Sequence, residues 1–363
     1  MWIRLLLCTK DAVYTERLTA FFEKEYGDKL EISRFSNIEY LIESIEEHSA
    51  DFILFGEEFE DEALSYANKL PCMWAVLMNQ VYETENNSYV RIAKYQRADK
   101  LYKAILDAYS KGSKVKQFSS RAGGHEKAGA KVYIFLAAGG GVGTTTIARA
   151  YARKCAIREK VLYLNLEILG IPWSREDQDH GLDDIMMALK SRRDILSIKL
   201  ESAVTDTPDK VYTYNASTNP WNLLELTEAD IIRLIDGIRG LGEYSKIIFD
   251  VGTGLTERET ALLKCADHLI CVVEDNDNTQ DRVKFDRLCE VLRILEQKSG
   301  IKLLRKMRIF RNKAVRNTGA DWSGSEIREA GWAPRIEQAS YDAVENRIMQ
   351  SDAFDHMEIS DEE

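Results

Sequence analysis

The segment with the clearest chemical potential is the run Ala138-Gly139-Gly140-Gly141-Val142-Gly143-Thr144-Thr145-Thr146. In a phosphate-binding loop of the form G-x-x-x-x-G-K-[ST], glycine amides surround the phosphates and the lysine reaches the β and γ oxygens. Here Thr144 stands at the position of that lysine. The sequence therefore predicts that residues 139–146 hold phosphate through their amides but lack the usual cation.

Two carboxylates at the ends of apolar runs could serve the metal that accompanies a bound nucleotide. Asp250 ends the run Lys246–Asp250, and Glu167 follows the apolar residues 161–166. The carboxyl ends of parallel strands meet at one edge of a sheet, so both acids are expected to face the glycine loop. We predict that Asp250 and the hydroxyl of Thr145 or Thr146 bind Mg²⁺, with Thr145 as the first candidate, and that Glu167 and Asp250 are the candidate catalytic acids. An aspartate after a strand can also cap a helix.

The segments around the loop alternate between strand and helix patterns. Residues 132–137 form a fully apolar strand that leads into the loop, and residues 145–158 form the helix after it. The alternation continues, with strands expected at 160–166, 246–250, 268–273 and 307–311 and helices at 229–241, 257–265, 282–298 and 341–350. This pattern predicts a parallel sheet covered on both faces, in a doubly wound domain over residues 131–350. An acidic, frayed tail is expected at 351–363.

The first 110 residues carry another α/β pattern. Five short apolar runs, at 3–9, 30–35, 51–55, 73–78 and 89–94, alternate with helical segments. They predict a doubly wound, flavodoxin-like domain over residues 1–110. Residues 111–130 are rich in Lys, Ser and Gly and are expected to be a linker.

The composition is that of an acidic globular protein. Its 60 Asp and Glu against 49 Lys and Arg give a net charge of −11, which makes no strong case for nucleic-acid binding. No apolar stretch approaches the ~20 residues of a membrane span. The six cysteines form no C-x-x-C pair. We expect a cytoplasmic protein with reduced thiols.

The glycine loop and the strand ends together resemble the ParA/MinD family of ATPases. The family pattern is K-G-G-V-G-K-T-T, and residues 139–146 match it except at both lysines, where Gly139 and Thr144 stand. In the family the first lysine reaches across a dimer and the second acts in its own subunit. By the same resemblance, Asp250 matches the Walker B aspartate. Glu167 matches the second acid of the D-x-D motif, which positions the attacking water.

Two later segments resemble the part of this family that holds the base. Asn312 and Lys313 lie in a segment whose asparagine reads the adenine edge, and Pro334 and Arg335 lie in the loop that closes over the base. The resemblance implies that all four residues bind the nucleotide, with ATP or ADP and Mg²⁺ as ligands. It also implies a nucleotide-dependent homodimer.

The missing lysines are expected to affect binding and hydrolysis differently. A charge-assisted hydrogen bond contributes about 1.5–3 kcal/mol, and backbone amides and Mg²⁺ still hold the phosphates without it. Removing positive charge from a phosphoryl-transfer transition state costs about 10³–10⁵ in rate. We therefore expect a protein that binds ATP–Mg²⁺ and hydrolyses it very slowly or not at all.

The first domain resembles a response-regulator receiver. Lys94 matches the lysine after strand five, but Gly56 stands where the phosphorylated aspartate belongs, and only Asp11 follows strand one. Glu57 and Glu58 are interpreted as solvated loop charges. Because glycine has no carboxylate, aspartyl phosphate cannot form at position 56, and the domain is expected to serve docking or dimerisation.

A degenerate receiver, a linker and a ParA/MinD-like domain in this order resemble the TadZ/CpaE family. The resemblance implies polar localisation and assembly of a Flp/Tad-type pilus secretion machinery, with contacts to other Tad pilus-assembly components. The alternative is an active ParA/MinD-type ATPase that positions DNA or other cargo, which would need the lysines and a basic surface. A nitrogenase-iron-protein-type reductase would need cluster cysteines on loops after strands. A MinD-like membrane clock would need a basic C-terminal anchor, whereas residues 351–363 are acidic.

Overall fold

A computed structural model describes residues 3–47, 49–80, 89–112, 129–173, 181–191, 195–275, 279–314, 327–337 and 339–357. The chain divides into two compact units, Met1–His125 with Met187–Ala203, and Glu126–Met186 with Val204–Glu363. Residues 113–128 of the expected linker and residues 358–363 of the expected tail lie outside the described residues.

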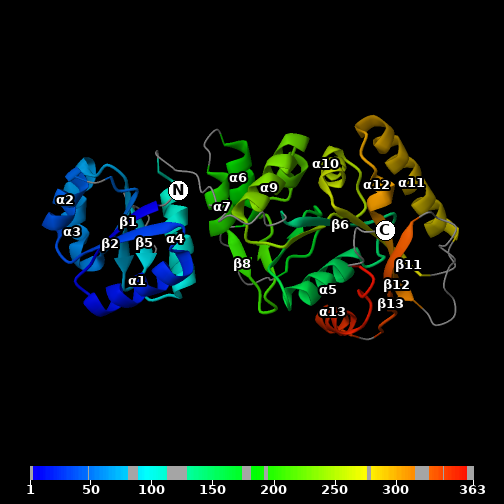
Figure 1. The fold of residues 1–363 in the computed structure, drawn as a ribbon, viewed down its shortest axis with the longest axis horizontal. Coiled ribbons are helices and arrows are strands. Elements are labelled where there is room, and N and C mark those ends of the chain that lie inside the picture. Colours follow the sequence, from blue (N-terminus) through cyan, green and yellow to red (C-terminus); the bar gives the residue numbers. More distant parts are fainter. Residues whose placement is uncertain are drawn as a thin grey trace. The chain divides into compact units, whose positions relative to one another are not determined.

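The first unit contains a five-stranded parallel sheet in the order β2-β1-β3-β4-β5 (Figure 1). Its elements are β1 (Ile3–Cys8), α1 (Ala12–Tyr26), β2 (Leu30–Phe35), α2 (Ile38–Glu47), β3 (Phe52–Gly56), the 3₁₀ turn Glu57–Phe59, α3 (Glu60–Tyr66), the 3₁₀ turn Ala67–Lys69, β4 (Met73–Met78), β5 (Val90–Ala93), α4 (Ala98–Ser110) and α7 (Leu196–Ser202). Leu5 and Leu7 of β1 pack in the cluster with α1 and α4, whereas Leu6 and Cys8 pack in the cluster with α2 and α3. Burial on both faces explains the continuously apolar β3, and the predicted doubly wound fold is confirmed.

Helix α7 belongs to the first unit, although it lies far along the chain. The sequence placed residues 187–203 within the second domain, so this is a correction to the expected boundaries. The carboxylate of Glu201 binds Lys29 Nζ at 2.6 Å and accepts a hydrogen bond from the Tyr102 hydroxyl at 2.7 Å. Lys199 pairs with Asp107 of α4, and Ile198 is fully buried in the core of this unit. These buried, paired charges tie α7 to α4 in a way that residue order could not reveal.

The second unit contains an eight-stranded sheet in the order β13-β12-β11-β6-β10-β7-β9-β8, and only β8 is antiparallel to its neighbour. Its elements are β6 (Lys131–Ala137), α5 (Thr144–Ala156), β7 (Val161–Asn165), α6 (Leu182–Lys190, which runs across the division between the units), β8 (Val204–Asp206), β9 (Tyr212–Tyr214), α8 (Trp221–Leu224), α9 (Glu228–Leu241), β10 (Lys246–Asp250), α10 (Glu257–Cys265), β11 (His268–Glu274), α11 (Thr279–Ser299), α12 (Leu303–Lys306), β12 (Met307–Ala314), β13 (Arg328–Pro334) and α13 (Tyr341–Gln350). Helices α9 and α10 cover one face, and α5 and α13 cover the other (Figure 1). The predicted parallel sheet with two covered faces is therefore confirmed.

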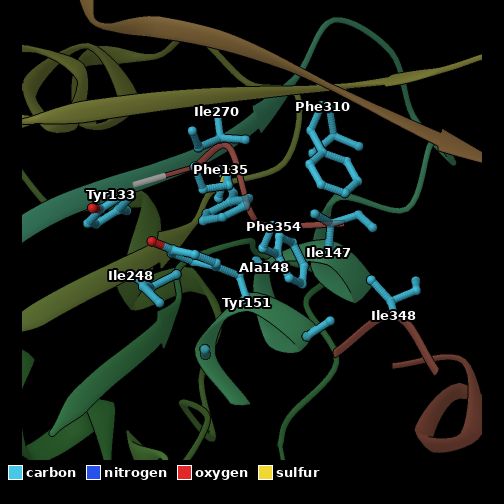
Figure 2. Close-up of a cluster of buried hydrophobic side chains, with 14 of the residues drawn as sticks. Tyr133, Phe135, Ile147, Ala148, Tyr151, Ile248, Ile270, Phe310, Ile348 and Phe354 are labelled. Carbon is cyan, nitrogen blue, oxygen red and sulfur yellow. The ribbon is translucent and has the colours of Figure 1, made fainter. Parts of the chain in front are cut away.

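The core beneath α5 includes residues from the end of the chain. Figure 2 shows Tyr151 of α5 between Tyr133 and Phe135 of β6 and Phe354, and the rings of Tyr151 and Phe354 lie 5.4 Å apart. Phe354 is only 4% exposed and also packs on Phe310. The expectation of a frayed tail from residue 351 is thus wrong for residues 351–357. Their apolar side chains anchor α5, the helix that follows the glycine loop.

Candidate functional site

The glycine loop connects β6 to α5 as the sequence predicted. Gly141 and Gly143 have φ values of +80° and +93°, which side chains with a Cβ rarely adopt. Gly143 is the N-cap of α5 and provides no side-chain cap, so the first amides of the helix remain available to an anion. A Cβ on Gly140 would have no atom within 4 Å, which leaves the loop open on this side. The local backbone is therefore suited to cradle phosphate.

A pocket of about 790 Å³ opens at this loop. Its lining residues are Gly139, Gly140, Gly141, Gly143, Thr144, Thr145, Thr146, Glu167, Gly252, Thr253, Asn312, Lys313, Pro334, Arg335, Ile336, Glu337, Ala339, Ser340, Tyr341 and Val344. The structure thus brings together every predicted site residue except Val142 and Asp250. Val142 is 6% exposed and packs in the core, and Asp250 lies beneath the pocket with 0% exposure.

Asp250, at the end of β10, is the buried acid of the site. Its Oδ2 accepts a hydrogen bond from the Tyr163 hydroxyl at 3.0 Å, while Oδ1 has no hydrogen-bond partner among the described residues. Burial raises the pKa of Asp250 to about 6, although the neighbouring Thr145 and Tyr163 hydroxyls lower it. A buried carboxylate with one unsatisfied oxygen is costly unless a cation compensates it.

Mg²⁺ fits this arrangement. The ion prefers oxygen ligands and usually combines one or two protein groups with phosphate oxygens and water. Oδ1 of Asp250 is unsatisfied, and Thr145, whose hydroxyl neighbours Asp250, is one of the residues that line the pocket. Within the described ranges, no three His, Cys, Asp or Glu side chains form a metal cluster of their own. A metal held by Asp250 and Thr145 would therefore depend on the nucleotide for further ligands.

Glu167 follows β7 and lines the pocket beside the Asp250 strand. A Cβ at Gly252, which has a φ of +64°, would lie 2.9 Å from Glu167 Oε1. The Glu167 amide donates to Asn165 Oδ1 at 2.8 Å. Asn165 stands at the position of the first acid of the D-x-D motif, and its side chain stabilises the turn. Of these two residues, only Glu167 lines the pocket.

Asn312 and Lys313, at the end of β12, contact the glycine loop itself. Asn312 Nδ2 donates to the Val142 carbonyl at 2.7 Å, and its side chain lies so close to Gly143 that a Cβ there would collide with it. Lys313, with a φ of 55°, donates from Nζ to the Gly141 carbonyl at 2.7 Å. Both residues therefore hold the glycine loop in shape.

Glu274, at the end of β11, pairs with two residues of the pocket lining, and the sequence did not single it out. Its two carboxylate oxygens pair with Lys313 Nζ at 3.0 Å and Arg335 Nη2 at 2.9 Å. This links the ends of β11, β12 and β13 at one edge of the sheet. The only sequence signal is an acid after an apolar run, the same signal that identified Asp250.

A charged cluster lies behind the loop helix. Arg149 and Arg153 of α5 approach the Glu345 carboxylate of α13 at 3.7 and 3.4 Å, and both guanidiniums lie over the Trp173 ring. Glu345 is 1% exposed. Burial raises the pKa of Glu345 to about 7, although the two arginines lower it. The cluster therefore carries a carboxyl group that titrates near neutral pH.

We expect Glu345→Gln to change the pH dependence of stability. Because the folded-state pKa is above the unfolded value, the stabilisation from protonation is complete below pH 4.5 and is lost as the pH rises through about 7. A rise of the pKa to about 7 corresponds to a loss on the order of 3 kcal/mol at high pH. In thermal unfolding, the melting temperature of the variant relative to that of the unaltered protein should rise between pH 5 and pH 8. Asp352→Asn, at an exposed aspartate, is the control, and an equal difference at both pH values would contradict the expectation.

The receiver-type site of the first domain is filled by a side chain of its own loop. A Cβ on Gly56 would lie 2.5 Å from Glu58 Oε2, so the Glu58 carboxylate occupies the space of a side chain at position 56. Oε1 accepts hydrogen bonds from the Thr9 hydroxyl at 2.7 Å and from the Lys10 amide. Partial burial raises the pKa of this carboxyl, but these hydrogen bonds hold it below its usual range. Glu58 is exposed, as the interpretation as a solvated loop charge requires, but its carboxylate is also held by Thr9 and Lys10.

The remaining predicted charges of this site also have partners. Glu57 Oε2 accepts a hydrogen bond from the Asn79 amide at 2.8 Å, so Glu57 is not purely a solvated charge either. Lys94 Nζ pairs with Asp11 Oδ2 at 2.9 Å. The lysine and the single acid after β1 thus meet as they would in a receiver, without a carboxylate on β3.

The comparisons with known proteins agree with this geometry. Residues 1–110 match the family model described as "TadZ-like, receiver domain". A ParA family ATPase from Chlorobium tepidum superposes with a TM-score of 0.50 at 18% identity, covering 63% of this chain and 96% of the other. At this identity the match shows the fold. No curated protein matches the sequence significantly.

Two further solved structures superpose with lower scores. A putative plasmid partition protein from Borrelia burgdorferi, bound to AMPPNP, is 16% identical with a TM-score of 0.48, and covers 63% of this chain and 95% of the other. The septum site-determining protein MinD from Pyrococcus horikoshii, complexed with Mg-ADP, is 16% identical with a TM-score of 0.43, and covers 63% and 94%.

The fold and the loop define a two-domain α/β protein, with a receiver-like domain followed by a ParA/MinD-like P-loop domain. More narrowly, residues 1–110 match the model of the TadZ-like receiver domain. The predicted resemblance is confirmed at this level. None of the helices within the described ranges has the length and apolar character needed to cross a membrane.

Proposed function

We propose that the second domain binds ATP or ADP with Mg²⁺ and hydrolyses ATP very slowly or not at all. The observation that carries this proposal is the pocket at the glycine loop, with the unsatisfied Asp250 Oδ1 beneath it and no lysine at position 139 or 144. The loop amides and the start of α5 would bind the phosphates. Thr145 and Asp250 would hold Mg²⁺, which neutralises phosphate charge, and Glu167 would orient water.

The test measures binding, turnover and oligomeric state on one preparation of the full chain. We expect calorimetry to detect ATP binding that weakens when Mg²⁺ is chelated, and a coupled assay to detect phosphate release close to background. Absence of binding would reject the proposal. Brisk, protein-dependent phosphate release would favour the alternative, an active ParA/MinD-type ATPase, and a DNA-shift assay would then test DNA as its cargo.

For the whole chain we propose a role in polar localisation and assembly of a Flp/Tad-type pilus secretion machinery. The match of residues 1–110 to the TadZ-like receiver domain supports this role. We place the protein in the cytoplasm, with a homodimer and other Tad pilus-assembly components as partners. Sedimentation with and without ATP–Mg²⁺ tests the dimer. A fluorescent fusion that is uniformly distributed in piliated cells would count against polar localisation.

A further inference from the structure

The first residue of the glycine loop faces a lysine from a distant helix. A Cβ built on Gly139 would lie 3.3 Å from Lys284 Cδ and 3.4 Å from Lys284 Nζ. Lys284 belongs to α11, whose start follows β11 at the same edge of the sheet as the loop. A side chain at position 139 would therefore compete with Lys284 for the same space, and glycine leaves that space to the lysine.

We propose that Lys284 is a phosphate-binding residue that supplies positive charge at the glycine loop, where position 139 has no side chain. The inference rests on the proposed nucleotide binding and names the cation for it. Gly139 lines the pocket, so an ammonium group beside it lies at the rim of the phosphate cradle. The lysine side chain has four flexible methylene groups and can follow a ligand over several ångströms.

The charge of Lys284 is available to a ligand. Its ion pair with Asp281 of the same helix has an N–O distance of 3.4 Å, which is long for a charge-assisted hydrogen bond. The Lys284 side chain is 53% exposed. Exposed ion pairs of this kind contribute little to stability, so exchanging Asp281 for a phosphate oxygen costs little.

The other cations at the pocket are already paired. Lys313 and Arg335 share the Glu274 carboxylate, and Lys313 also donates to the Gly141 carbonyl. Their combined charge is partly neutralised, and their contacts hold the wall of the pocket. Among the described residues that surround the loop, Lys284 is thus the cation with the weakest partner.

The contribution of Lys284 should depend on how many phosphates the ligand carries. Each further phosphate group places more charged oxygens in the loop near Lys284, also when Mg²⁺ is bound, so we expect the effect to be largest for ATP, smaller for ADP and smallest for AMP. A lysine that only supports the fold would affect the three nucleotides equally. The ratio of the ATP and AMP affinities is therefore the informative measurement.

The test is calorimetric titration of the full chain with ATP, ADP and AMP in the presence of Mg²⁺. We expect Lys284→Ala to weaken ATP binding about three- to tenfold and AMP binding less, as for loss of an exposed charge-assisted contact. Lys298→Ala, at an exposed lysine in the last turn of α11, should leave all three affinities unchanged. The double variant Lys284→Ala/Gly139→Lys should recover ATP affinity, because a lysine at position 139 would enter the vacated space.

Each outcome decides the inference. Unchanged ATP affinity in Lys284→Ala, or an equal loss for all three nucleotides, would overturn it while the proposed nucleotide binding stands. An unaltered protein that binds no nucleotide would overturn both. Equal melting temperatures of Lys284→Ala and Lys298→Ala would show that the loss does not come from unfolding.

Discussion

Thr144→Lys is expected to raise ATP turnover about 10²–10³-fold, the amount that removal of one transition-state donor costs in related electrostatic sites. Thr144 is the first residue of α5 and is one of the residues that line the pocket. A lysine there would place its ammonium group where charge develops on the transferred phosphoryl group. Phosphate release under saturating Mg–ATP is the measurement.

Two controls separate this effect from a general gain of charge. Ile157→Lys adds a lysine at the C-terminal end of the same helix, where Ile157 is 68% exposed, and should leave turnover at the original rate. Thr144→Lys combined with Asp250→Asn keeps the new lysine but removes the buried carboxylate, and should also remain slow. If Thr144→Lys binds ATP and melts normally but shows no increase, the missing lysine is not the reason for slow hydrolysis.

The glycine loop and Asp250 could be predicted from the sequence because their signals are local. A strand, a glycine run and a helix follow one another without interruption, and left-handed φ values at Gly141 and Gly143 need the residues that stand there. Asp250 was recognised by the same logic, since it ends an apolar run. Chain order on a parallel sheet then placed the other strand-end residues near the loop.

Residues whose roles depend on distant partners could not be predicted in the same way. Glu274 is connected to the site only through Lys313 and Arg335, which line the pocket and lie at the ends of two later strands. Phe354 lies in a polar segment and is buried because Tyr151 and Phe310 form a surface for it. The residues next to Glu274 and Phe354 in the sequence do not indicate these distant contacts.

The assignment of α7 to the first unit has the same origin. Residues 187–203 carry no pattern that separates them from the second domain, and only the pairings of Lys199 and Glu201 reveal where they pack. Glu58 is a similar case. Hydrogen bonds from the Thr9 hydroxyl and the Lys10 amide hold its carboxylate in the space next to Gly56, and the sequence of the loop does not indicate these contacts. The sequence therefore predicts where the loop after β3 lies, but not which contacts its side chains make.

Asp250→Asn is expected to have opposite effects on stability and on ligand binding. Without nucleotide, the variant should melt at a higher temperature, because it removes a fully buried carboxylate whose Oδ1 has no partner among the described residues. With Mg–ATP, the unaltered protein should gain stability and the variant should gain much less. We expect the affinity for Mg–ATP to fall about ten- to a hundredfold, as for loss of a charged metal ligand worth about 1.5–3 kcal/mol.

The opposite signs make this prediction specific. A variant that simply misfolds would lose both stability and binding, and a carboxylate with a purely structural role would leave Mg²⁺-dependent binding intact. Asp236→Asn, at an exposed aspartate of α9, should change neither quantity. Melting temperatures with ATP alone and with ATP and Mg²⁺ separate the metal from the nucleotide. If the added stabilisation by Mg²⁺ is equal in Asp250→Asn and in the unaltered protein, then Asp250 is not a ligand of the metal, and its buried charge must be balanced by another group.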